Sequence, residues 1–235
     1  MITFTLEDCM QLMARYPDKH FDLTFVDPPY GIGEDWKKRR RHRGEYKFSD
    51  TTYKNDCIPP KEYFDELSRI SCHQIIWGYN YFTEILGPTN YLIIWNKCGC
   101  KNGTLNYSQA EIAFTTIRRP AQVFQVSWDG GRMGSETGIR KIHPHQKPVD
   151  LHVKILRKYA KPDWKILDTH AGSGSSVIAC HRLALNIAAC EIDPQYYRAA
   201  KRRIEAETKQ QELFCAAERR LQNDFLFEEL KVSNL

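Results

Sequence analysis

Hydrophobic positions along the chain follow two periods, one typical of strands and one typical of helices. Short apolar runs rich in branched and aromatic residues predict strands at residues 2–6, 21–27, 73–78, 91–97, 111–117, 164–170 and 186–193. Apolar residues at helical spacing predict helices at residues 7–16, 61–70, 149–160 and 175–185, and a long amphipathic helix from about residue 195. Because strands and helices alternate, the sequence predicts an α/β fold, a doubly wound and mostly parallel sheet with helices on both faces.

Two stretches interrupt this alternation. Residues 35–60 form a long charged segment that we expect to be a flexible basic loop, and from residue 118 to residue 146 periodicity fades around several glycines. The chain has 235 residues and 42% hydrophobic content, enough for one substantial core. We therefore interpret residues 1–235 as a single domain that carries a small insertion at residues 118–146.

Composition narrows the class of protein. No apolar run is long enough to span a bilayer and the first residues lack a secretory signal, so we expect a soluble, cytoplasmic protein. The eight cysteines are scattered without a Cys-x-x-Cys pair, which predicts that there is no metal site. His143 and His145 lack a matching cysteine or carboxylate, so we interpret them as turn or phosphate-contacting residues rather than metal ligands.

The net charge of +5 is modest but unevenly distributed. Six basic side chains lie within residues 37–43: Lys37, Lys38, Arg39, Arg40, Arg41 and Arg43. Taken alone, such a run is either an exposed loop or a patch that binds phosphates. A neighbouring motif is needed to distinguish an exposed loop from a phosphate-binding patch.

The stretch FDLTFVDPPYGIG joins a buried strand to an unusual end. The strand stops at Asp27, and Pro28 and Pro29 then fix the backbone and donate no hydrogen bond, which leaves their carbonyls able to accept from a ligand. Tyr30 follows at once. A carboxylate beside a rigid turn and an aromatic ring predicts a binding site for a flat, polar ligand.

A second constellation, KILDTHAGSGSSVIACHRLALNIAACEID, reads as strand, glycine turn, helix and strand. Gly172 and Gly174 let the backbone turn tightly and approach a ligand, and Glu191 can accept hydrogen bonds from ribose hydroxyls. A dinucleotide fits less well, because Val177 stands where its fingerprint needs a glycine and Asp168 would repel a pyrophosphate. S-adenosylmethionine, with a sulfonium, an ammonium and no phosphate, suits these charges better.

Four motifs in order, DPPYGIG, HPHQKPVDL, ILDTHAGSGSS and CEIDPQYY, resemble the beta-class DNA amino-methyltransferases, which modify an exocyclic amine of adenine or cytosine. The resemblance covers residues 2 to about 203. It implies a Rossmann-like S-adenosylmethionine-dependent methyltransferase fold, S-adenosylmethionine as cofactor, and double-stranded DNA as substrate with the target base flipped out. It also implies a prokaryotic or phage-encoded protein, with residues 118–146 as its target-recognition lobe.

The same resemblance assigns roles to individual residues. Asp27 and the Pro28 carbonyl would accept hydrogen bonds from the target amine, Pro29 would complete the turn, and Tyr30 would stack on the base. The implied cofactor pocket comprises Asp8, Asp27, Lys147, Pro148, Asp168, His170, Ala171, Gly172, Gly174, Ser175 and Glu191. Nucleic-acid contacts are expected from the six basic residues within 37–43 and from Arg118, Arg119, Trp128, Arg132, Arg140 and Lys141.

Several alternatives stay open from the sequence. Adenine N6 is the leading target because Asp27 opens the tetrapeptide where cytosine-amine enzymes more often carry serine, and cytosine N4 is the runner-up. RNA or a protein amide is a third substrate class, and a non-catalytic DNA-binding relative is the rival from outside the enzymes. His170 stands where the family usually has an aromatic residue against the cofactor. The short recognition lobe is consistent with a short site, with loose specificity, or with help from a second subunit in a homodimer.

Overall fold

The computed structural model describes residues 1–32, 56–97, 108–128 and 134–209. Within this part of the chain, eight strands form one sheet in the order β1-β8-β7-β2-β3-β5-β4-β6. The strands are β1 (Ile2–Leu6), β2 (Phe21–Val26), β3 (Ser71–Trp77), β4 (Leu92–Asn96), β5 (Ala110–Thr115), β6 (Gln122–Gln125), β7 (Lys165–Asp168) and β8 (Asn186–Glu191).

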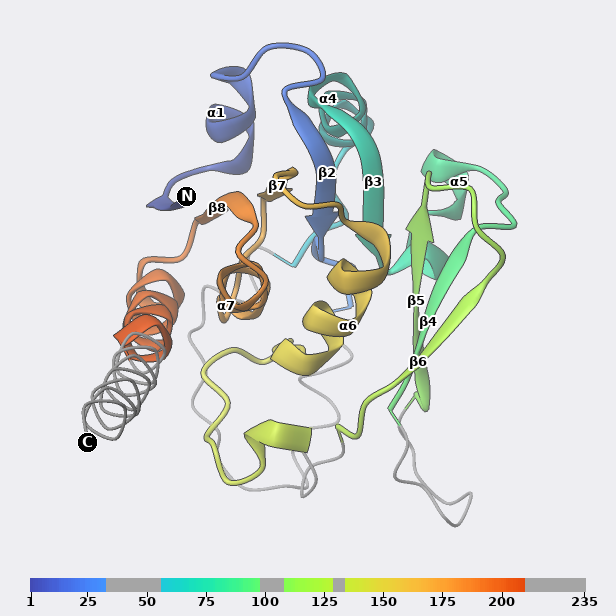
Figure 1. Ribbon diagram of the computed structural model, residues 1–235. Coiled ribbons are helices and arrows are strands. Elements are labelled where there is room, and N and C mark those ends of the chain that lie inside the picture. Colours follow the sequence, from blue (N-terminus) through green and yellow to red (C-terminus); the bar gives the residue numbers. More distant parts are fainter. Residues whose placement is uncertain (33–55, 98–107, 129–133, 210–235) are drawn as a thin grey trace, which may run out of the picture.

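Helices cover both faces of this sheet (Figure 1). Side chains of α1 (Cys9–Ala14) and α4 (Lys61–Ile70) belong to the apolar cluster on one face. Those of α6 (Val149–Tyr159), α7 (Ser175–Arg182) and the helix at residues 194–209 belong to the cluster on the other. Three shorter elements complete the described chain: η1 (Tyr79–Tyr81), α5 (Thr83–Leu86) and η2 (Gly134–Glu136).

The sheet is parallel except at one strand. Strands β1, β8, β7, β2 and β3 run in the same direction, β5 runs antiparallel to both β3 and β4, and β6 pairs parallel with β4. The carboxyl ends of β8, β7, β2 and β3 therefore lie along one edge, where parallel sheets place ligands. The predicted α/β class with a doubly wound, mostly parallel sheet is confirmed.

Strand β2 shows why the sequence folds this way. It lies between β7 and β3, so both of its faces are covered and it is apolar almost throughout. Leu23 and Phe25 point into the core under α6 and α7, whereas Phe21 and Val26 belong to the core under α1 and α4. The strand thus packs against both cores and carries the chain to Asp27 at the ligand-binding edge of the sheet.

The structure corrects some of the predicted boundaries. The expected helix at 7–16 spans only Cys9–Ala14, because Asp8 caps it: its carboxylate accepts hydrogen bonds from the Met10 and Gln11 backbone amides at 2.8 and 3.3 Å. Irregular structure was expected throughout residues 118–146, but residues 122–125 form strand β6 at the edge of the sheet. In the described residues, no helix is both long enough and apolar enough to cross a membrane.

Candidate active site

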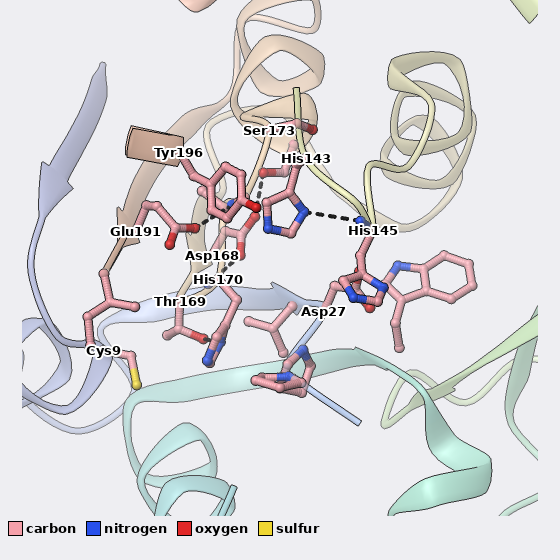
Figure 2. Close-up of a pocket in the computed structure, with 18 of the residues that line it drawn as sticks. Cys9, Asp27, His143, His145, Asp168, Thr169, His170, Ser173, Glu191 and Tyr196 are labelled. Carbon is pink, nitrogen blue, oxygen red and sulfur yellow. Dashed lines mark hydrogen bonds between the residues drawn. The ribbon is translucent and has the colours of Figure 1, made fainter. Parts of the chain in front are cut away.

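The two sequence motifs open onto one cavity of about 460 Å³ at the carboxyl ends of the strands. Residues that follow β1, β2, β7 and β8 line it, together with the segment from His143 to Lys147 (Figure 2). Of the predicted catalytic and cofactor residues, Pro148 and Gly174 alone are outside the lining. The fold thus brings Asp27 and Asp168 into the same pocket, although 140 intervening residues separate them.

The Asp27 carboxylate is held from two sides. The Tyr30 hydroxyl donates a hydrogen bond to one carboxylate oxygen, and the Lys147 ammonium pairs with the other. Lys147 Nζ also lies 3.3 Å from the Tyr30 hydroxyl oxygen. Lys147 was predicted to belong to the cofactor pocket, and the structure places its ammonium beside the Asp27 carboxylate and the Tyr30 hydroxyl, which we call the acceptor site.

The Tyr30 ring is fixed by aromatic neighbours and by one glycine. Tyr81 stacks on it with ring centroids 4.9 Å apart and an interplanar angle of 15°, and Phe82 meets it edge-on at 5.9 Å. A Cβ atom at Gly78, whose φ is +79°, would lie 2.2 Å from Tyr30 Cε1. Gly78 therefore makes room for the ring, and the sequence carried no motif that would have identified it.

Behind Lys147 lies a second acid that the sequence analysis missed. Glu111, on β5, is 3.2 Å from Lys147 and 2.5 Å from Lys97 at the nearest N–O pairs. Burial raises the pKa of Glu111, but the two lysines outweigh it and hold that pKa at about 2. Burial lowers the pKa of Lys147, but Asp27 and Glu111 outweigh it and raise that pKa above its ordinary value. Glu111 and Lys147 are thus both charged at pH 7, and each lies between two partners of the opposite sign.

Asp168 occupies the cofactor side of the cavity. Its carboxylate accepts hydrogen bonds from the His170 backbone amide, at 2.9 Å, and from the Ser176 hydroxyl. Burial raises its pKa to about 7, helped by the negative charges of Asp27 and Glu191, and the two hydrogen bonds offset only part of that rise. This carboxylate can therefore exchange its proton near neutral pH.

Glu191 organises the glycine turn. One carboxylate oxygen accepts the Gly172 amide and the other accepts the Asp193 amide, both at 2.9 Å. Gly172 has a φ of +52°, which a side chain would strain, and it lines the cavity next to Ala171. Gly174, predicted to approach the cofactor, lies outside the cavity lining and makes room for the helix at residues 194–209: a Cβ there would lie 2.9 Å from Ile204 Cδ1.

His170 packs at the place predicted for a flat group. Its Nδ1 lies 2.9 Å from Thr169 Oγ1 and 3.3 Å from the Tyr63 hydroxyl, and its ring meets that of Tyr63 edge-on at 5.4 Å. Burial lowers the pKa of His170 to about 4, so the ring is neutral at pH 7. A neutral imidazole held by hydrogen bonds can line an apolar or aromatic part of a ligand.

A partly buried ion pair connects the glycine loop to the helix at residues 194–209. Arg203 donates to the Ser173 carbonyl and the Ser175 hydroxyl at 2.9 Å each, and its other nitrogen lies 2.6 Å from the Glu136 carboxylate. Glu136 also accepts the Val149 amide at 2.7 Å, at the start of α6. This network fixes the glycine loop and the segment that carries Lys147 relative to each other.

His143 and His145 lie in the cavity lining and are part of its packing. The backbone amide of His145 donates to Nδ1 of His143 at 3.3 Å, and the His143 ring meets that of Tyr196 at 4.4 Å (Figure 2). Desolvation lowers the pKa of His143 to about 3. Among the residues that the structure describes, no three His, Cys, Asp or Glu side chains are grouped as metal ligands.

The predicted nucleic-acid residues that the structure describes do not line the cavity. Arg118 and Arg119 precede β6, at the amino ends of β4 and β6 and thus at the edge opposite Asp27. Trp128 is a core residue, 8% exposed, with Lys141 Nζ 4.8 Å from its ring centroid. Arg140 is exposed. The remaining predicted contacts, Lys37, Lys38, Arg39, Arg40, Arg41, Arg43 and Arg132, lie outside the described residues.

Known proteins share this architecture. A family model described as DNA methylase matches residues 89–202. Type II methyltransferase M.HinfI of Haemophilus influenzae is 25% identical, over 84% of this chain and 66% of its own length. The crystal structure of M1.HpyAVI in complex with SAM superposes with a TM-score of 0.58 at 19% identity, over 87% of this chain and 99% of that one. The cytosine-N4-specific PvuII DNA methyltransferase superposes with a TM-score of 0.57 at 13% identity, over 88% of this chain and 90% of that one.

Proposed function

We propose that this chain is a DNA amino-methyltransferase that transfers a methyl group from S-adenosylmethionine to the N6 amine of adenine in double-stranded DNA. The DNA methylase family model that matches residues 89–202 and the likeness to M.HinfI, M1.HpyAVI and the PvuII enzyme support this proposal. One observation carries the proposal: the turn at Asp27–Tyr30 and the glycine loop at Asp168–Gly172 open onto the same cavity. A nucleophile bound at the first can thus meet a methyl donor bound at the second.

The residues present fit S-adenosylmethionine. Asp8, Asp168 and Glu191 line the cofactor side of the cavity, so its charge suits a cationic ligand. Gly172 lets backbone approach the ligand, and a volume of about 460 Å³ lies in the range of small-molecule sites. Asp168 would hold the ammonium end and Glu191 the ribose. When bound, the cofactor supplies an activated methyl group.

The protein's part in the chemistry is to bind and orient the amine. An aromatic amine is a poor nucleophile because its lone pair is delocalised into the ring. Hydrogen bonds from its two N–H groups to Asp27 and the Pro28 carbonyl would favour the pyramidal form, whose lone pair points at the methyl group. Positive charge then develops on the nitrogen, and the Asp27 carboxylate stabilises it.

Tyr30 would hold the base itself. Because a base inside a duplex cannot reach this cavity, it must be flipped out, at a cost of lost stacking. Tyr30 can offset part of that cost by stacking on the base, and Tyr81, 4.9 Å away on the Tyr30 ring, keeps the platform in place.

Adenine is proposed over cytosine on the strength of Asp27, which opens the DPPY tetrapeptide. The structural likeness does not separate the two, because the cytosine-N4-specific PvuII enzyme superposes as well as M1.HpyAVI does. Both targets present an exocyclic amine on a flat ring, so the same acceptors serve either one.

The proposal is tested by incubating the protein with labelled S-adenosylmethionine and unmethylated genomic DNA, followed by nucleoside analysis. Asp27→Ala is the test variant, and Asp65→Ala, an exposed carboxylate on α4, is its matched control. We expect label in N6-methyladenine with wild type and the control, and none with Asp27→Ala. Label in N4-methylcytosine would reassign the base. No label in any DNA, from folded protein that binds the cofactor, would reject the proposal.

A further inference from the structure

The acceptor site contains a positive charge, the Lys147 ammonium, that the proposed methyl transfer does not require. Asp27 is needed as an anion beside an amine that becomes positive, yet the Lys147 ammonium is paired with the same carboxylate. An uncompensated cation at that position would oppose the charge that develops on the amine. Lys147 is also 6% exposed, so water does little to screen it.

The compensation comes from Glu111. Its carboxylate lies on β5, the antiparallel strand beside β3, and reaches the opposite side of the Lys147 ammonium at 3.2 Å. The ammonium also lies over the rings of Trp77 and Tyr30, at 5.3 and 5.7 Å from their centroids. A lysine fixed by two acids and two rings has little freedom to move.

Lys97 completes the row on the far side. It pairs with Glu111 at 2.5 Å and lies 5.0 Å from the Trp95 ring centroid, so that Glu111 is itself held in place. The sequence of charges from the cavity outward is Asp27, Lys147, Glu111 and Lys97. Because each ion has a partner of opposite sign, the set can be buried without leaving an unpaired charge next to the reacting amine.

We propose that Glu111 is a positioning residue for methyl transfer, an inference that rests on the proposed function. Through Lys147, Glu111 fixes the Asp27 carboxylate, and its negative charge offsets the lysine charge that faces the reacting amine. Glu111 does not touch the reacting atoms, so its effect falls on the rate of transfer rather than on cofactor binding. Besides Tyr30, the titratable groups that also interact with Lys147 are His143, His145 and His152, which all belong to the cavity lining.

Glu111→Gln, Glu111→Asp and the control Glu62→Gln, an exposed glutamate on α4, test this assignment. The readouts are the single-turnover rate of methyl transfer at saturating cofactor and the Kd of S-adenosylmethionine. We expect Glu111→Gln to slow transfer about tenfold, the equivalent of about 1.4 kcal/mol at the barrier, with a Kd within twofold of wild type. Glu111→Asp, which keeps the charge, should recover most of the rate, and Glu62→Gln should match wild type.

Two results would overturn the assignment. The first is a wild-type rate of methyl transfer in Glu111→Gln. The second is an equal loss of rate in Glu111→Gln and Glu111→Asp together with weaker cofactor binding, which would indicate a structural role. NMR titration of the Lys147 ammonium, in protein without DNA, separates this inference from the proposed function. A lower Lys147 pKa in Glu111→Gln supports the positioning contact even if wild type methylates no DNA. An unchanged Lys147 pKa rejects the contact, whatever the activity.

Discussion

Replacing Asp168 by asparagine is expected to stabilise the ligand-free protein. The folded protein raises the pKa of this carboxyl from an ordinary 3.8 to about 7, so its ionised form is disfavoured by folding. One pKa unit corresponds to about 1.4 kcal/mol. At pH 8 the ionised Asp168 therefore lowers the free energy of unfolding by about 4 kcal/mol. Asparagine keeps the shape and the acceptor for the His170 amide without the charge.

The pH dependence of the effect has a definite sign. A raised carboxyl pKa means that the unfolded chain binds fewer protons than the folded protein between pH 3.8 and about 7, so wild type gains stability as pH falls through that window. The penalty is fully present above about pH 7. At pH 5 the remaining cost is about 2 kcal/mol, so the advantage of Asp168→Asn should shrink by about half.

Urea unfolding of both proteins at pH 8 and pH 5 measures this difference, with Asp65→Asn as a control on the exposed face of α4. Isothermal titration with S-adenosylmethionine is run on the same samples. We expect wild type to bind and to gain about 2.7 kcal/mol at a hundredfold excess over Kd, whereas Asp168→Asn gains far less. The reasoning would be refuted if Asp168→Asn were less stable than wild type at pH 8. It would also be refuted if the variant changed the free energy of unfolding by the same amount at both pH values.

Three further changes test other parts of the site. Gly78→Ala should displace the Tyr30 ring and abolish methyl transfer, checked by activity with circular dichroism as the folding control. Tyr81→Ala should weaken binding of DNA that carries a mismatched, easily flipped target about two- to tenfold, since a stacked pair is worth about 0.5–1.5 kcal/mol. Arg203→Met should leave Glu136 buried and unpaired and lower the free energy of unfolding by about 3 kcal/mol in urea.

The parts of the fold that the sequence predicts are those set by local pattern. Apolar runs such as residues 21–26, and glycine turns such as that at Gly172, carry their structure in a few neighbouring residues. Strand β6 was missed because only four residues pair, two of them polar, and Pro120 and later glycines surround them. Its pairing with β4 also explains why Trp128, predicted to contact DNA, lies in the core.

The missed site residues share a different cause. Glu111 lies in a strand whose inward and outward faces alternate, so its sequence context is that of an exposed acid, and Lys147 is 36 residues away. Glu136 and Arg203 are 67 residues apart, and nothing local marks Glu136 as buried or the two as partners. Ion pairs over such separations depend on the tertiary fold, which the pattern of single residues does not specify.

The electrostatics of the cavity connect its stability to its ligand. Asp168, Glu191 and Asp27 approach one another because parallel strands end at the same edge, and their mutual repulsion adds to burial in raising the Asp168 pKa. Lys147 forms ion pairs with Asp27 and with Glu111. It therefore compensates the charge of Asp27 but not that of Asp168 or Glu191. The cofactor side therefore retains negative charge that a cation can offset. A cationic methyl donor would then bind more weakly as pH falls below about 7 and Asp168 takes up a proton, whereas a neutral ligand of the same shape would not. Comparing the pH profiles for S-adenosylmethionine and for a neutral nucleoside without the amino-acid part, such as 5′-methylthioadenosine, would distinguish charge from shape, because the second ligand lacks the ammonium that Asp168 would hold. The affinity for the nucleoside should not fall with Asp168 protonation, and an equal fall for both ligands would reject the charge contact.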